Sequence, residues 1–281
     1  MTNSHGHFAW YELVTTDVEA AKAFYTTVMG WGAWDASIPG RPYAMFTAGQ
    51  TPVGGLIELP ADARARGVGP SWVGYVRVND VDAAAGRIER LGGVIHVPPT
   101  TVPHVTRFSV FADPETARLA LFKWLNPGPE QRADPDAPGR VGWHELLAAD
   151  CDKALAFYGD LFGWQKAEPG GGATDPYWLF AVGGETIGGM FTKPATIPDP
   201  SWLYYFNTSD IDATAQRVTA GGGRILNGPV DVPGGSAVIQ CTDPQGAVFA
   251  LEGRRGRNVV GYFERTGSRD PADAHSRRWS W

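Results

Sequence analysis

The chain has 281 residues, 43% of them hydrophobic and 19% charged, with a net charge of -6. This length predicts about two globular domains, and the absence of a long apolar run argues against a membrane-spanning helix or a signal peptide. Only Cys151 and Cys241 are present, which excludes a disulfide framework or a thiolate metal cluster and predicts two buried thiols. We therefore expect a soluble, cytoplasmic protein.

Two pairs of segments repeat along the chain. Residues 8–31 match 141–164 at ten of 24 positions, and residues 70–93 match 200–223 at eleven of 24. Order and spacing are kept, so the halves are duplicated domains. We expect domains at 8–125 and 141–253, a linker rich in Pro and Gly at 126–140, and a basic tail at 254–281.

Each repeated segment predicts a strand that runs into a helix. An aspartate follows each strand and can cap the helix by accepting backbone N–H groups, whereas glycines mark the helix ends. These aspartates are Asp17, Asp80, Asp150 and Asp210. Short β-branched and aromatic runs broken by turns come next, which gives a βαβββ unit used four times.

The βαβββ units and the D-x-x-x-A-x-x-F-Y…G-W pattern, with Phe24, Tyr25, Gly30 and Trp31 in the first half, resemble the vicinal oxygen chelate superfamily. This superfamily includes glyoxalases, bleomycin-binding proteins and ring-cleaving dioxygenases. The W-x-E-L motifs at 10–13 and 143–146 are similar to a two-domain branch labelled hydroxylase or Cfp30B-like. The resemblance implies an α+β fold of tandem glyoxalase-like domains, each a pair of βαβββ modules forming a curved mixed sheet, or cup.

Metal-binding members of this superfamily use three strand positions, which the resemblance carries onto this chain. The first holds Trp10 and Trp143, the second Val73 and Leu203 (or Trp72 and Trp202 after a shift of one residue), and the third Ala120 and Ala250. None of these side chains ligates a divalent ion, and the six histidines do not recur between the halves. We therefore expect no metal and no other cofactor.

Strand parity predicts which side chains enter the cups, because residues two apart share a face. Glu12 and Tyr75 then face one cup and Glu145 and Tyr205 the other, as catalytic or supporting pairs. Which modules combine into a cup stays open at this point. The expected ligand-binding residues are Trp10, Trp143, Trp72, Trp202, Arg77, Asn207, Ala120, Ala250 and Glu252. Because Asn207 is neutral where the first half has Arg77, we expect the Glu145 cup to suit an apolar guest better.

Three classes of function fit these residues. The first is metal-independent binding of a small, largely apolar molecule, aromatic or carbonyl-containing. The second is a metal-independent lyase, isomerase, hydratase or cyclase, in which a cup glutamate is the general base and a tyrosine donates to a carbonyl. The third is a metal-dependent glyoxalase or dioxygenase. The acidic body disfavours nucleic acid as a partner, and we expect a monomer or homodimer that does not bind membranes.

Overall fold

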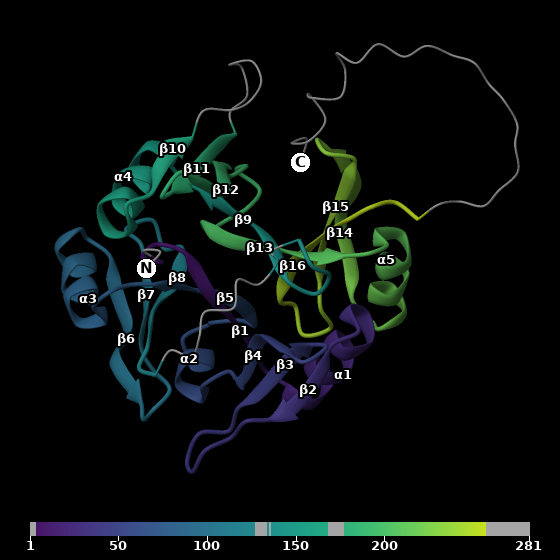
Figure 1. The fold of residues 1–281 in the computed structure, drawn as a ribbon, viewed down its shortest axis with the longest axis horizontal. Helices are drawn as coiled ribbons and strands as arrows, with labels where there is room; N and C mark the ends of the chain where they lie inside the picture. Colours follow the sequence, from purple (N-terminus) through teal and green to yellow (C-terminus); the bar gives the residue numbers. More distant parts are fainter. Residues whose placement is uncertain (1–3, 127–133, 135, 168–176, 257–281) are drawn as a thin grey trace, which may run out of the picture.

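A computed structural model of the chain describes residues 4–126, 134, 136–167 and 177–256. Each half forms one mixed sheet of eight strands with few helices, which confirms the predicted α+β fold of tandem βαβββ modules (Figure 1). The expected tail lies outside the described residues from 257 onward, and the expected linker is described only in part. Among the described residues, no helix has the length and apolar character needed to cross a membrane.

The first sheet has the strand order β2-β3-β4-β1-β5-β8-β7-β6. One module contributes β1 (Phe8–Thr15), α1 (Val18–Met29), β2 (Gly32–Asp35), β3 (Ala44–Ala48) and β4 (Thr51–Glu58), and a short helix, α2 (Ala61–Ala65), follows it. The other module contributes β5 (Ser71–Arg77), α3 (Val81–Arg90), β6 (Val94–Val102), β7 (Thr106–Ala112) and β8 (Arg118–Trp124).

The second sheet repeats this order as β10-β11-β12-β9-β13-β16-β15-β14. Its first module holds β9 (Val141–Ala148), α4 (Cys151–Phe162), β10 (Gln165–Ala167), β11 (Trp178–Val182) and β12 (Glu185–Thr192). Its second holds β13 (Ser201–Thr208), α5 (Ile211–Ala220), β14 (Arg224–Val232), β15 (Ser236–Thr242) and β16 (Val248–Gly253). The antiparallel pairs β1–β5 and β9–β13 show that modules combine within a half, which the sequence left open.

All four predicted aspartates cap their helices. Asp17, for example, accepts from the Ala20 backbone N–H at 2.9 Å, and Asp80 accepts from Ala83 at 3.0 Å. These bonds satisfy donors that the first helical turn leaves unpaired. Because each cap follows a central strand directly, it fixes where the chain leaves the sheet and starts across its convex face.

The two halves share one core between their convex faces. The Tyr25 hydroxyl in α1 donates to the Asp243 carboxylate at 3.2 Å, and Tyr158 in α4 donates to Asp113 at 2.8 Å, so each half reaches into the other. Cys151 and Cys241 are buried in this core as predicted. The concave faces therefore point outward, toward the bottom of Figure 1 for the first sheet and toward the top for the second.

Equivalent residues of the two halves meet between the sheets. The Tyr11 hydroxyl lies 2.5 Å from His144 Nε2, and His144 Nδ1 lies 2.6 Å from the Ile187 carbonyl oxygen. The carbonyl can only accept, so Nδ1 carries the proton and Nε2 accepts from Tyr11. Phe8 stacks on the imidazole with centroids 3.8 Å apart. His144 thus lies on the face of β9 opposite to Glu145, and its burial lowers its pKa to about 4.

Replacing His144 by Gln is expected to reduce the loss of stability on acidification. Because the folded pKa of about 4 lies below the usual 6.5, the unfolded chain takes up this proton first. The free energy of unfolding therefore falls as the pH drops from 6.5 toward 4, by at most about 1.4 kcal/mol per pH unit. Urea titrations of the wild type and His144→Gln on both sides of this range measure the difference. His104→Gln, which changes an exposed histidine, should keep the wild-type pH dependence, and equal acid sensitivity in His144→Gln and the wild type would contradict the prediction.

Candidate functional site

The centre of each concave face is built by the same strand register. In the first cup, the concave face of β1–β8, the sheet aligns Met45, Gly55, Glu12 and Val73 across β3, β4, β1 and β5. In the second cup, the concave face of β9–β16, it aligns Leu179, Gly189, Glu145 and Leu203. A single carboxylate flanked by a glycine and an apolar residue thus lies at the centre of each cup.

In the first cup, two tyrosines and a tryptophan surround this carboxylate. The Tyr75 hydroxyl donates to Glu12 Oε1 at 2.8 Å, Tyr43 also hydrogen-bonds to Glu12, and Trp10 Nε1 donates to the Tyr43 oxygen at 2.9 Å. Burial raises the pKa of Glu12, although the bonds from Tyr75 and Tyr43 oppose the shift. Burial and the nearby carboxylate also raise the pKa values of both tyrosines, which therefore remain neutral donors.

The second cup repeats this network with one addition. Tyr205 donates to Glu145 Oε2 at 2.8 Å, Tyr177 donates to Oε1 at 3.0 Å, and Trp143 Nε1 donates to the Tyr177 oxygen at 2.8 Å. Gln240 Nε2 lies 3.4 Å from the Tyr205 oxygen and occupies the place of Val110 in the first cup. Both predicted Glu–Tyr pairs therefore exist as hydrogen-bonded pairs.

Tyr43 and Tyr177 belong to these networks although sequence reasoning did not select them. A Cβ atom on Gly55 would overlap the Tyr43 hydroxyl, and one on Gly189 would overlap the Tyr177 ring. The missing side chains leave room for each phenol to lie beside the glutamate on the neighbouring strand. The signal in the sequence is the Gly-Gly pair in β4 and β12, together with a tyrosine directly before the preceding strand, β3 or β11.

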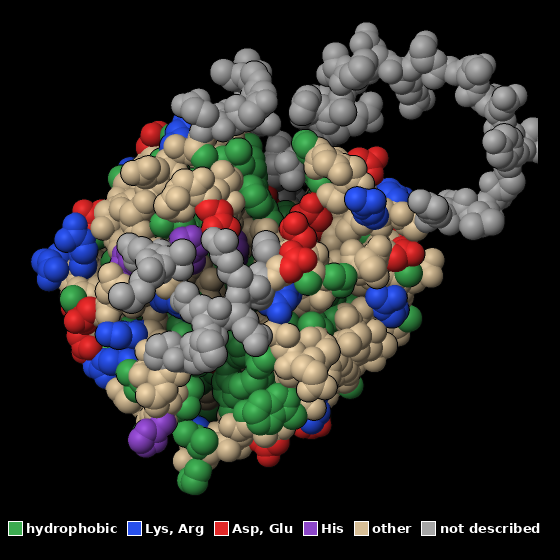
Figure 2. Space-filling view, viewed as in Figure 1, with side chains coloured by type: hydrophobic (Ala, Val, Ile, Leu, Met, Phe, Trp, Pro, Cys, Tyr) green, Lys and Arg blue, Asp and Glu red, His purple; other side chains and the backbone are tan. Residues whose placement is uncertain are grey.

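Apolar side chains form the walls of the cups. Ala120 and Ala250 lie on the concave faces and are fully buried there. In the first cup, the partly exposed apolar side chains that pack against the floor are Ala9, Trp10, Val14, Phe108, Val110 and Trp124. Figure 2 shows hydrophobic side chains gathered in a hollow at the lower centre of this view, on the side where the first sheet opens.

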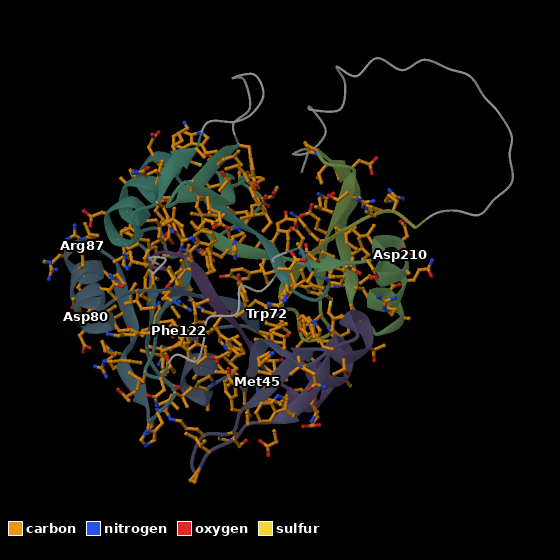
Figure 3. All side chains as sticks on the ribbon, in the orientation of Figure 1. Met45, Trp72, Asp80, Arg87, Phe122 and Asp210 are labelled. Carbon is orange, nitrogen blue, oxygen red and sulfur yellow. The ribbon has the colours of Figure 1, made fainter. Side chains whose placement is uncertain are left out.

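The prediction that Trp72 and Trp202 line the cups is wrong. Both are buried on the convex faces, where Trp72 Nε1 donates to the Tyr25 hydroxyl at 2.9 Å and Trp202 Nε1 to Tyr158 at 3.2 Å. In Figure 3, Trp72 lies between the two sheets, whereas Met45 and Phe122 lie on the two arms of the first sheet. The reason is parity, because each tryptophan is one residue away from the concave-facing Val73 or Leu203.

The three polar residues predicted beside the cups lie near strand ends. Arg77 Nη1 donates to Ser4 Oγ at 2.6 Å, and the Asn207 amide fills the space above Gly142. Glu252 accepts from the Ser236 hydroxyl at 2.6 Å. Each of these side chains thus contacts a segment close to the end of its own strand.

The side chains in the cups do not suit a divalent ion. The positions that the resemblance implies for metal ligands hold indole, isopropyl, isobutyl and methyl groups, which offer no donor atom of the kind that such ions bind. The described donors near each centre are one carboxylate and neutral phenols, to which the second cup adds the Gln240 amide. Within the part of the chain that the structure describes, no three His, Cys, Asp or Glu side chains are grouped as a metal site requires.

Comparison with known proteins gives consistent matches. A family model described as Glyoxalase/Bleomycin resistance protein/Dioxygenase superfamily matches residues 6–121 and 140–251. "Putative glyoxylase CFP32" of Mycobacterium bovis is 33% identical over 244 residues, 86% of this chain and 92% of that protein. "Anthracycline biosynthesis protein DauV" of Streptomyces sp. is 34% identical over 259 residues, 86% of this chain and 91% of that protein. The Mn(II)-bound glyoxalase of Novosphingobium aromaticivorans shares the fold at a TM-score of 0.61 and 16% identity, covering 90% of this chain and 83% of that chain.

Replacing Gly55 by Ala is expected to displace Tyr43 and to destabilise the protein by about 1 to 3 kcal/mol, because the new methyl group overlaps the phenol. Urea denaturation measures the cost. In a Tyr43→Ala background the overlap is gone, so the same glycine substitution should cost much less. Gly69→Ala, at a glycine with open space around it, serves as the control. An equal cost in both backgrounds would show that Gly55 is required for another reason.

Proposed function

Because the chain belongs to the glyoxalase/bleomycin resistance protein/dioxygenase superfamily, we propose that it binds a small, largely apolar molecule in a cup without a metal ion. The observation that carries this proposal is the glutamate–tyrosine–tyrosine network at the centre of an apolar concave face. Small-molecule sites combine this kind of apolar wall with a few polar groups that orient the ligand. The ligand therefore carries a hydroxyl or carbonyl on an aromatic or aliphatic body.

The network supports recognition of either polar group. A ligand hydroxyl can donate to the carboxylate, and a ligand carbonyl can accept from a phenol that turns away from the glutamate. The names of the relatives point to different roles, since one refers to glyoxylase and another to anthracycline biosynthesis. The proposal consequently rests on the cup itself and names a ligand class but no pathway.

Metal independence is part of this proposal. The three positions that ligate a metal ion in other members are occupied in the first half by Trp10, Val73 and Ala120. In the second half they are occupied by Trp143, Leu203 and Ala250. A metal-dependent glyoxalase or dioxygenase is the least favoured of the three candidates, because it would need several oxygen or nitrogen donors converging at these places.

The second candidate is a metal-independent enzyme acting next to a carbonyl, as a lyase, isomerase, hydratase or cyclase. The raised pKa of Glu12 favours it, since a carboxylate in an apolar wall is a stronger base than one in water. Glu12 would remove a proton from the substrate, and Tyr75 would donate a hydrogen bond to the oxygen that gains charge. Glu145 and Tyr205 are the corresponding pair in the second cup.

Glu12→Gln and Glu145→Gln distinguish binding from catalysis. Glutamine keeps the volume and most of the hydrogen bonds, so a site used only for binding should lose at most about 1 to 3 kcal/mol of affinity. A catalytic base should lose about two decades of turnover or more, while affinity stays near the wild-type value. Titration calorimetry and turnover, with a compound recovered from the purified protein by mass spectrometry, give both quantities. If neither substitution changes affinity or rate, the glutamates support the fold and the proposed site is wrong.

Purified protein is expected to contain well under one equivalent of Fe, Mn, Ni or Zn, and chelation should leave ligand affinity unchanged. The physical reason is the set of indole and aliphatic groups at the family's ligand positions. Elemental analysis and titration before and after dialysis against a chelator test this expectation. Stoichiometric metal together with chelator-sensitive binding would overturn it.

A further inference from the structure

We propose that the first cup is the ligand site and takes a flat aromatic molecule bearing a hydroxyl or carbonyl, whereas the second cup is filled by its own side chains. This inference rests on the proposed function and specifies its site and ligand class. It also reverses the preference for the Glu145 cup that the charges of Arg77 and Asn207 indicated.

The second cup is packed from both of its arms and from a loop. Its buried cluster combines side chains of β9, β13 and β16 with Tyr177 and with Phe191 of β12. Ile197, in the loop after β12, packs against this cluster. The loop is held in place, since Lys193 Nζ donates to the Ile197 carbonyl at 2.7 Å and the Ile197 N–H donates to the Pro194 carbonyl at 3.0 Å. These contacts hold an apolar side chain of the loop against the buried cluster of the second cup.

The first cup lacks this filling among its described residues. Its cluster comes from β1, β5, β7 and β8, and most of its members are only partly buried. Ile57 stands where the second half has Phe191, and it is partly exposed. Helix α2 follows β4 at the place of the Ile197 loop and buries none of its five residues. The apolar walls of the first cup thus remain accessible.

The glutamate of the second cup is also less exposed to solvent than the glutamate of the first cup. Glu145 is 1% exposed, and each of its oxygens accepts from a tyrosine. Gln240, which is 6% exposed, adds an amide beside Tyr205, where the first cup has only Val110. Glu12 is partly exposed at the equivalent position. Glu12 can therefore meet a ligand, whereas Glu145 is enclosed by its own partners.

The wall of the first cup is aromatic where that of the second is not. Phe108, Phe122 and Trp124 face it, and the corresponding residues of the second half are Val238, Glu252 and Arg254. The rings of Phe122 and Trp124 pack edge to face, with their centroids 4.6 Å apart. Phe122 and Tyr75 pack in the same way, with centroids 6.0 Å apart. Such rings present both faces and edges to a flat aromatic guest. A polar group of the guest would then reach Glu12, Tyr75 or Tyr43.

Titration calorimetry with 2-naphthol, a flat aromatic compound with one hydroxyl, tests this inference on the full chain. We expect one site per chain. Phe108→Val, which copies the residue of the second cup, should weaken binding about tenfold or more, because it removes a ring from the wall. Val238→Ala, a truncation at the equivalent place in the second cup, should leave affinity and stoichiometry unchanged. Circular dichroism melts confirm that both variants are folded.

Several outcomes would overturn the inference. Two equal sites per chain, or one site weakened by Val238→Ala but not by Phe108→Val, would place the ligand differently and leave the proposed function intact. Binding of the saturated decahydro-2-naphthol without binding of 2-naphthol would show that the aromatic class is wrong, while small-molecule binding stands. If neither compound binds, both the inference and the proposed function fail for this ligand class.

Discussion

Two reciprocal hydrogen bonds, from Tyr25 to Asp243 and from Tyr158 to Asp113, join the halves of this molecule. Each aspartate also closes a turn in its own half, where the second oxygen accepts backbone N–H groups such as that of Ala117 or Ala247. Burial raises the pKa of both carboxyl groups, so these bonds offset a desolvation cost. Because the helices pack inward around these pairs, the concave faces point away from the shared core.

Duplication within one chain allows a packing that two identical chains could not adopt. Tyr11 and His144 are equivalent positions, and they contact each other as donor and acceptor. Gly74 and Tyr204 are also equivalent, and the Gly74 N–H donates to the Tyr204 hydroxyl at 2.7 Å. A side chain on Gly74 would collide with the Tyr204 ring and with Phe8. In a symmetric dimer of one such domain, the residue at each of these two positions would contact its own copy in the partner. Fusion of two domains in one chain permits the two halves, and with them the two cups, to diverge.

The sequence predicted most of what depends on local pattern. The aspartate caps and the βαβββ order gave the positions of the helices and strands. Alternation along β1, β5 and β8 placed Glu12, Tyr75 and Ala120 on the correct face, because strand alternation is a local property. A shift of one residue misplaced Trp72 and Trp202. Tyr43 and Tyr177 were missed because their contact with glutamate depends on the pairing of three strands, β3, β4 and β1 or their equivalents. Neither strand pairing nor the choice of partner module can be read from periodicity alone.

The shared network also shows why binding and proton transfer make different demands on the same carboxylate. A glutamate that accepts hydrogen bonds from two phenols has a fixed orientation and a hydrogen-bond partner for each oxygen, which suits a rigid binding surface. To act as a base it must also reach a proton of the substrate with a remaining lone pair. In the second cup Glu145 is 1% exposed, so a substrate would have to displace the side chains around it. In the first cup the same residue types leave Glu12 partly exposed and its pKa raised. The capacity for chemistry therefore depends less on which residues are present than on how tightly the surrounding walls enclose them.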